Sequence, residues 1–222
     1  MYCQICGLIQ LSLNKVIKKM EKHLDILIIG AGISGLGMAA HLLKNCPKRQ
    51  LDIIERRESF GGTWDLFKYP GIRSDSDMST FGFNFKPWQQ SNVLADGASI
   101  KGYLSEVVDE YQLKDKIHFQ HRLLAANYDS QLKKWIVQIK DAEQQPQTWI
   151  ANFVIGCTGY YNYDRGFQPD FPNQKAFQGS VIHPQFWPEI FDYTDKKVVI
   201  IGSGATAITL VPALAKGGAA HV

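Results

Sequence analysis

Short, largely apolar runs alternate with amphipathic stretches in the first third of the chain. Residues 25–29 (Asp-Ile-Leu-Ile-Ile) and 51–55 (Leu-Asp-Ile-Ile-Glu) are rich in isoleucine, which favours strands. Runs of this kind are typical of parallel strands that are buried on both faces. Residues 35–44 between them predict a helix whose small side chains let it lie close to the sheet. Two strands joined by a helix over about 30 residues form a βαβ unit.

The same pattern returns near the end of the chain. Residues 197–201 (Lys-Val-Val-Ile-Ile) predict another buried strand, and residues 205–216 predict a helix that Gly217-Gly218 ends. Residues 219–222 would then lead into a further strand. These segments predict the start of a second βαβ unit.

Less regular segments lie between the two units. The pattern predicts a helix at residues 100–111, a short strand at 117–119, an antiparallel pair at 123–128 and 134–140, and a strand at 149–155. Residues 56–98 and 160–194 are rich in proline and aromatic residues and show little periodicity. A loop as long as the first of these is usually functional.

Each predicted βα pair contains a glycine-rich loop. The first is Gly30-Ala31-Gly32-Ile33-Ser34-Gly35, and the second is Gly202-Ser203-Gly204-Ala205-Thr206-Ala207. Glycines at this point allow a tight turn and let a pyrophosphate reach the helix N-terminus, whose dipole favours anions. Glu55 ends the strand after the first loop, where a carboxylate can hydrogen-bond the ribose of an adenine dinucleotide. A purely structural βαβ turn is the alternative, but the combination predicts dinucleotide binding and an α/β, Rossmann-like fold.

Three other segments permit two interpretations each. The Gly61-Gly62-Thr63-Trp64 segment is either a turn or a close backbone approach to a bound cofactor. In residues 69–75, Arg73 and Asp75 form either a surface pair or a polar group near a bound cofactor. Residues 157–160 (Cys-Thr-Gly-Tyr) either end a strand or bring backbone close to a cofactor.

A spaced motif lies in the second long connection. Residues 177–188 contain Phe177, Gly179, His183 and Trp187-Pro188 in the order F-x-G-x-x-x-H-x-x-x-W-P. His183 could be a general base, a metal ligand or a structural residue. Because no carboxylate or second histidine lies nearby in the sequence to complete a metal site, we interpret His183 as a hinge residue.

Composition excludes several classes of protein. The chain has 222 residues, a formal net charge of +3 and no dense run of basic residues, so we expect no nucleic-acid binding. No uncharged apolar stretch approaches the roughly 20 residues of a membrane helix. Four cysteines without a framework pattern indicate a reducing, cytoplasmic setting.

The N-terminal segment differs from the rest. Its lysines at positions 15, 18 and 19 follow the mildly apolar residues 3–13, which is the reverse of a secretory signal. Cys3-x-x-Cys6 lacks a second ligand pair, so we expect no metal site there. Met20 lies directly before the first strand, and we expect residues 1–19 to be a mis-called start or a disordered extension.

Together the loops and motifs resemble those of class B flavoprotein monooxygenases, and the linker motif resembles the fingerprint of type I Baeyer–Villiger monooxygenases. The subgroup that includes the ethionamide-activating monooxygenase is most similar, through residues 62–67 (Gly-Thr-Trp-Asp-Leu-Phe), 73–78 (Arg-Ser-Asp-Ser-Asp-Met) and 159–164 (Gly-Tyr-Tyr-Asn-Tyr-Asp). The resemblance runs from about Met20 to Val222.

This resemblance implies an FAD domain built from N- and C-terminal parts, with an NADPH domain inserted. It implies that NADPH reduces the flavin and that O2 then gives a C4a-peroxyflavin. A ketone would become an ester or lactone, or a sulfide or thioamide would be oxygenated. The FAD contacts it implies are Gly30, Gly32, Ser34, Gly35, Glu55, Gly62, Thr63, Trp64, Asp65, Leu66, Asp75 and Leu123. The NADPH contacts it implies are Gly202, Ser203, Gly204, Ala205, Thr206 and Ala207, and it gives Arg73 and Asp75 catalytic roles beside the flavin.

We therefore predict an FAD-binding domain at residues 20–160, a linker at 161–194 and the truncated start of an NADPH-binding domain at 195–222. In such enzymes the peroxyflavin-stabilising arginine, the grip on the NADPH 2′-phosphate and the substrate pocket would lie beyond Val222. Apolar faces that the missing part covers would then be exposed. Two alternatives stay open: a non-catalytic fragment that at most binds FAD, and an N- or S-oxygenating flavin monooxygenase. The Trp187-Pro188 ending favours the Baeyer–Villiger type over the latter.

Overall fold

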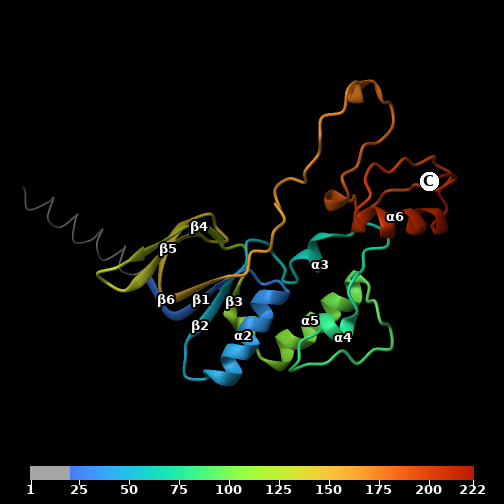
Figure 1. Cartoon of the computed structure of the whole chain (residues 1–222). Coiled ribbons are helices and arrows are strands. Elements are labelled where there is room, and N and C mark those ends of the chain that lie inside the picture. Colours follow the sequence, from blue (N-terminus) through green and yellow to red (C-terminus); the bar gives the residue numbers. More distant parts are fainter. Residues whose placement is uncertain (1–20) are drawn as a thin grey trace, which may run out of the picture. The chain divides into compact units, whose positions relative to one another are not determined.

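The computed structural model describes residues 21–222, and of Glu21 the backbone alone (Figure 1). The predictions for residues 1–19, including Cys3 and Cys6, lie outside the described residues. The chain forms two compact units. The first contains the chain up to Phe60 together with Val108–Thr158, and the second contains Gly61–Val107 together with Gly159–Val222. These units are defined by their internal contacts and not by the cofactor they bind. The predicted FAD-binding domain, linker and NADPH-binding domain therefore remain a prediction.

The first unit is built on a six-stranded mixed sheet in the order β3-β2-β1-β6-β5-β4 (Figure 1). Strands β1 (Glu21–Ile29), β2 (Leu51–Ile54) and β3 (Ile117–His118) are parallel, and the 3₁₀ turn η1 (Lys114–Lys116) precedes β3. Helix α2 (Ile33–Asn45) connects β1 to β2, as the βαβ pattern predicts.

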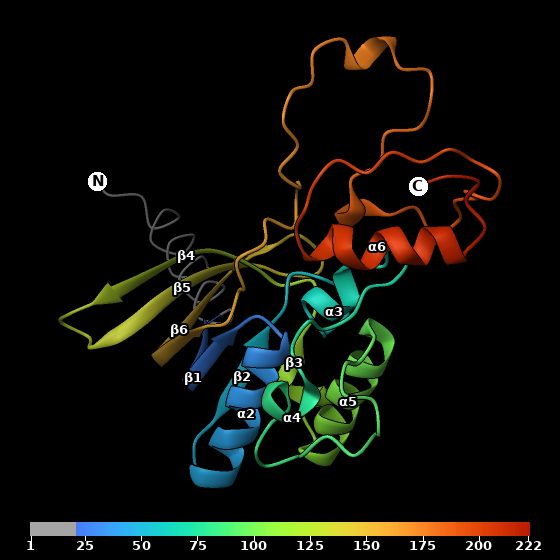
Figure 2. The same ribbon diagram turned by 45° about the vertical axis from the view of Figure 1, so that its right-hand side comes forward.

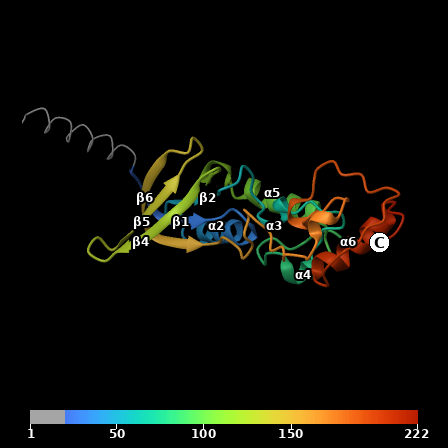
Figure 3. The ribbon, with the colours of Figure 1, turned by 90° about the horizontal axis from the view of Figure 1, so that it is seen from above.

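The other half of the sheet is antiparallel. Strands β4 (Arg122–Asp129), β5 (Lys134–Lys140) and β6 (Pro146–Gly156) pair in sequence order, and Figure 3 shows them as a curved group. Strand β6 also pairs with β1 in parallel, which joins the two halves. The carboxyl ends of β1 and β6, two central strands, therefore lie side by side at the same end of the sheet.

Each face of the sheet buries apolar side chains. Helix α2 lies against β1 and β2, where Ile28 and Ile53 are fully buried (Figure 2). The opposite face carries a cluster formed by Leu27, Ile29, Ile54, Val137, Ile139, Trp149 and Ala151. The N–H groups of Asp25 and Ile26 both donate to the Gln50 carbonyl oxygen, so β1 has a local irregularity at this point.

The second unit is mostly helical and irregular. Its helices are α3 (Thr63–Leu66), α4 (Met78–Phe81), the greater part of α5 (Gly97–Glu110) and α6 (Ala205–Lys216), with 3₁₀ turns η2 (Gln174–Ala176) and η3 (Pro184–Phe186). Figure 3 shows α6 in red near the C-terminal end. In the core of this unit, Phe67 and Tyr69, which follow α3, pack with Leu210 and Leu214 of α6.

One predicted element is wrong. Residues 197–201 do not form a strand; only a parallel bridge joins Lys197 to His221. Residues after Val198 have no neighbouring strand, and Val199 and Ile201 are 84% and 73% exposed. A buried parallel strand needs partners on both sides, and within the described residues only the short segment 220–222 lies alongside.

Candidate functional site

The first glycine loop lies where the strands of the first unit end. The Gly30 N–H donates to the Ile54 carbonyl oxygen at 2.8 Å. A Cβ atom on Gly30 would lie 2.4 Å from the Cys157 carbonyl oxygen, and one on Gly35 would lie 1.9 Å from the Gly30 carbonyl oxygen. Glycine is therefore required at both positions, because backbone occupies the space that a side chain would need.

This packing points the N-terminus of α2 to the edge of the sheet. Gly32 is the N-cap, with extended backbone at φ −79° and ψ −173°, and no side chain caps the helix. The first turn contains no acidic residue, and Ser34 is exposed. Because the first N–H groups of a helix lack partners within it, this end is suited to bind an anion such as a pyrophosphate.

Glu55 is buried directly beneath the loop. Its side chain is 4% exposed, Oε2 accepts from the Ala31 N–H at 2.9 Å, and Oε1 accepts from the Arg57 N–H at 2.9 Å. Each carboxylate oxygen has a second lone pair, so these bonds leave capacity for a ribose hydroxyl. The Ala31 contact also shows that Glu55 anchors the glycine loop, a role that the sequence did not indicate.

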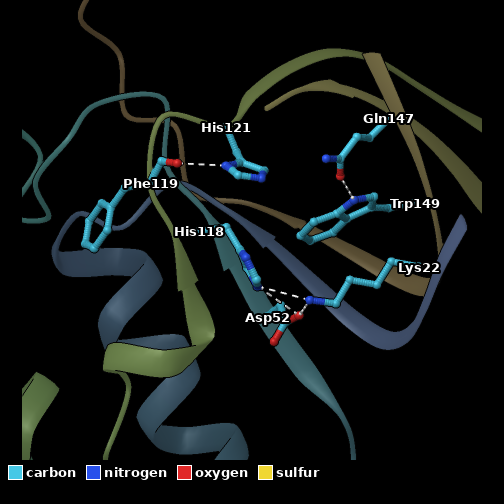
Figure 4. Close-up of polar contacts among 7 residues, drawn as sticks. All are labelled: Lys22, Asp52, His118, Phe119, His121, Gln147 and Trp149. Carbon is cyan, nitrogen blue, oxygen red and sulfur yellow. Dashed lines mark hydrogen bonds and ion pairs between the residues drawn. The ribbon is translucent and has the colours of Figure 1, made fainter. Parts of the chain in front are cut away.

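The backbone of Glu55 is fixed by the end of β3 and by the segment that follows it. Its N–H donates to the His118 carbonyl oxygen, and its carbonyl oxygen accepts from the His121 N–H, both at 2.9 Å. The His118 side chain extends this support (Figure 4): its Nε2 lies 3.1 Å from Lys22 Nζ and 3.2 Å from Asp52 Oδ2. Lys22 and Asp52 also form an ion pair.

The Trp149 indole lies against this polar cluster (Figure 4). The Lys22 ammonium lies 4.5 Å from the centroid of the indole, and the His118 ring meets the same indole edge-on at 5.0 Å. Burial raises the pKa of Asp52, but its contacts with His118 and Lys22 outweigh this effect and leave the pKa below its usual value. The ionised Asp52 therefore helps to hold β3, and through it Glu55, in place.

The turn after β6 also reaches the glycine loop. The Cys157 N–H donates to the Ile29 carbonyl oxygen at 2.8 Å, and the Cys157 carbonyl is the group that Gly30 approaches. Burial raises the pKa of the Cys157 thiol, which favours the protonated form. The structure thus brings three sequence-predicted segments of the first unit together: the loop, Glu55 and the turn at Cys157. Leu123 lies on β4 and packs against the core cluster of this unit.

In the second unit, Gly61-Gly62 forms a turn that leads into α3. Both glycines have positive φ, 115° and 57°. Thr63, Trp64 and Leu66 are half-buried, and Trp64 packs edge-on against Phe81 with ring centroids 5.6 Å apart. Asp65 is buried and forms an ion pair with Lys101 of α5.

Residues 69–75 pack on α6 through their first half. Gly71 has φ 83°, and a Cβ there would lie 2.5 Å from the Thr209 carbonyl oxygen. Ser74 is buried, and its N–H donates to the Ala95 carbonyl oxygen at 2.8 Å. Arg73 and Asp75 are exposed on either side of it, and no ion pair joins these two described residues. Their catalytic role remains a prediction.

His183 has a local structural contact in the linker. Its Nδ1 accepts from the Gln185 N–H at 3.2 Å and so caps η3, while its ring occupies the space where Gly166 would carry a side chain. Gln185 is buried and donates to the Asn162 carbonyl oxygen at 2.6 Å. These contacts are structural, and the hinge role of His183 remains a prediction. Among residues 21–222, no cluster of three or more His, Cys, Asp or Glu side chains could hold a metal ion.

At its helix N-cap, the second glycine loop has nearly the same backbone conformation as the first. Gly204 caps α6 with φ −80° and ψ −175°, close to the angles of Gly32. Residues 202–205 are exposed, and a Cβ on Gly202 or Gly204 would meet nothing within 4 Å. The loop therefore has the same capping geometry as the first but is not enclosed by neighbouring backbone.

The family model described as "FMO-like: Flavin-binding monooxygenase-like" matches residues 22–222. The chain belongs to this family. The resemblance inferred from the motifs is therefore confirmed, and so is the enzymatic character of the family.

Curated relatives carry matching names. "Probable FAD-binding monooxygenase AlmA" of Acinetobacter baylyi is 77% identical over 203 residues, and "FAD-containing monooxygenase EthA" of Mycobacterium tuberculosis (strain ATCC 25618 / H37Rv) is 49% identical over 203 residues. Each alignment covers 91% of this chain. The chain spans 41% of the length of each of these relatives.

Solved structures of monooxygenases have the same fold. "Oxidized steroid monooxygenase bound to NADP" has a TM-score of 0.76 at 27% identity and covers 89% of this chain and 37% of its own. "Open crystal structure of cyclohexanone monooxygenase" has a TM-score of 0.77 at 25% identity, with 90% and 39% covered. The predicted α/β, Rossmann-like fold is confirmed. No helix within residues 21–222 is both long enough and apolar enough to cross a membrane.

Proposed function

We propose that the chain is the FAD-binding part of an FAD- and NADPH-dependent monooxygenase of Baeyer–Villiger type that works in the cytoplasm. The observation that carries this proposal is the first glycine loop: its glycines abut backbone, its helix N-terminus is uncapped by any side chain, and the buried Glu55 carboxylate holds it. These features fit the phosphate and ribose of FAD.

In this proposal, the N–H groups of Ile33, Ser34 and Gly35 bind the FAD pyrophosphate, and Glu55 binds the ribose of the adenosine. Residues 62–66 and Asp75 lie toward the flavin. Gly202–Ala207 receive the NADPH pyrophosphate, since Gly204 repeats the cap geometry of Gly32. A bound flavin would supply the oxygenation chemistry, while this chain's residues bind and orient it.

The proposed substrates are ketones, which would become esters or lactones, with sulfides or thioamides as further oxygen acceptors. The names of the relatives support oxygenation in general, and the titles of the structural neighbours support ketone chemistry, since one of them is a cyclohexanone monooxygenase. The linker motif that ends in Trp187-Pro188 favours the Baeyer–Villiger type over N- or S-oxygenation alone.

Cofactor binding is tested by titrating the chain with FAD and following quenching of flavin fluorescence. We expect Glu55→Gln to weaken binding about tenfold or more, because a hydrogen bond to a charged group contributes about 1.5–3 kcal/mol. Glu58→Gln is the matched control, since Glu58 is exposed three positions further on. Equal FAD affinity of wild type and Glu55→Gln would contradict this placement.

The reaction is tested with a chimera in which this chain is joined to the remaining part of the AlmA relative. The proposal predicts NADPH-dependent formation of a lactone from a cyclic ketone. Sulfoxide from an aryl sulfide without any lactone would refute the Baeyer–Villiger assignment and favour the N- or S-oxygenating alternative.

A second candidate function is a non-catalytic fragment that at most binds FAD. The chain spans 41% of the length of the AlmA relative, so this candidate is tested on the chain taken alone. The chain alone, mixed with FAD, NADPH and a ketone, should then consume no NADPH in a substrate-dependent manner. Substrate-dependent consumption with an oxygenated product would exclude the fragment interpretation.

A further inference from the structure

A buried ion pair lies in the segment that follows Gly61-Gly62. Asp65, in α3, is 8% exposed, and its carboxylate pairs with the Lys101 ammonium. Lys101 is on α5, 36 positions further along the chain. A buried carboxylate is costly unless it is paired, and Lys101 supplies such a partner for Asp65.

Lys101 contacts the turn at a second point. A Cβ on Gly61 would lie 3.1 Å from Asp65 Cβ and 3.8 Å from Lys101 Cγ. The aliphatic part of Lys101 therefore lies beside Gly61 while its ammonium reaches Asp65. Within the turn, the Trp64 N–H donates to the Gly61 carbonyl oxygen and the Asp65 N–H to that of Gly62, each at 3.2 Å. The Lys101 side chain thus lies beside the start of this short turn and pairs with Asp65 near its end.

We propose that Lys101 is a positioning residue for the Gly61–Leu66 turn, and that the Lys101–Asp65 pair sets the charge that this turn presents to the flavin. The inference rests on the proposed function, in which residues 62–66 contact FAD. A positive charge near a flavin favours the reduced, more negative form, and a negative charge disfavours it. The ion pair keeps these two effects in balance.

Four variants separate charge from shape: Lys101→Met, Lys101→Arg, Asp65→Asn and the double variant Asp65→Asn/Lys101→Met. The reduction potential of bound FAD is measured by dye-linked titration, and FAD affinity by fluorescence. The matched control is Lys175→Met, because Lys175 is an exposed lysine in the same unit.

Lys101→Met should lower the reduction potential of bound FAD, and Asp65→Asn should raise it. The double variant should return it close to the wild-type value. Lys101→Met should also weaken FAD binding about tenfold, because it removes the ammonium that pairs with a buried carboxylate, whereas Lys101→Arg should keep the wild-type affinity. If Lys101 had a purely structural role, Lys101→Met and Asp65→Asn would weaken FAD binding without moving the reduction potential of bound FAD in opposite directions. If Lys101→Met does not fold, Asp65→Asn and Lys101→Arg still carry the test.

The inference would be overturned if the reduction potential of bound FAD stays unchanged in Lys101→Met and Asp65→Asn, or moves in the same direction in both. Such a result would not contradict the proposal that the chain binds FAD. Failure of the wild-type chain to bind FAD would instead overturn the proposed function, and the inference with it.

Discussion

Substitution of Gly35 by alanine tests the geometry of the first glycine loop directly. The new Cβ atom would lie 1.9 Å from the Gly30 carbonyl oxygen. Ordinary contacts between nonbonded heavy atoms are at about 3.5 Å, so α2 and the loop would have to separate by more than about 1 Å. Neither partner is a flexible side chain that could move aside, because both are backbone or directly attached to it.

The expected loss follows from two opposing terms. Alanine in a helix is favoured over glycine by about 1 kcal/mol, whereas overpacking of a tight contact typically costs about 1–3 kcal/mol. Separation would also open gaps beside Leu36 and Ala39, which are fully buried against the sheet. We expect Gly35→Ala to lower the free energy of unfolding by about 2 kcal/mol.

Gly102→Ala is the matched control, because Gly102 is on α5 and a Cβ there would meet nothing within 4 Å. It should raise the free energy of unfolding by about 0.5–1 kcal/mol, through helix propensity alone. Urea unfolding followed by circular dichroism measures both variants. Equal or greater stability of Gly35→Ala compared with wild type would refute the close approach of α2 to the loop.

Three further predictions use other contacts. The pKa of Asp52 is below its usual value, so its contribution to stability is present above the unfolded pKa of about 3.9 and is lost as the pH falls below it. Asp52→Asn should therefore reduce the loss of stability on acidification below about pH 4 in urea titrations, and an unchanged acid limb would argue against the cluster with His118. Gly71→Ala should destabilise the second unit more than Gly159→Ala, since both have positive φ but only Gly71 abuts α6; equal melting temperatures would disprove that contact. Val199→Lys with Ile201→Lys should delay aggregation in light scattering without lowering the melting temperature, because both side chains are exposed; a lower melting temperature would mean that they are buried.

Local patterns were sufficient for much of the first unit. The predicted strands at residues 25–29 and 149–155 lie within β1 and β6, and the helix at 35–44 lies within α2. These elements could be predicted because buried parallel strands and a helix with small side chains leave strong periodic signals. The glycine loop and Glu55 are close enough in sequence for a motif to relate them.

Contacts between distant positions could not be predicted in this way. Lys22 and His118 are 96 positions apart, and Lys101 and Asp65 are 36 apart, so no periodicity relates them. The error at residues 197–201 has a related cause: the apolar pattern reports strand propensity, but a strand also needs neighbours to pair with. The exposure of Arg73 and Asp75 likewise depends on the packing of the buried Ser74 between them.

The central claim is that FAD binds at the first glycine loop and the Glu55 carboxylate. A crystal structure of the chain grown with FAD tests it most directly. We predict that the pyrophosphate lies within hydrogen-bonding distance of the N–H groups of Ser34 and Gly35, with a ribose hydroxyl on Glu55. FAD bound at Gly202–Ala207 instead, or a first loop that stays empty at saturating FAD, would contradict the account.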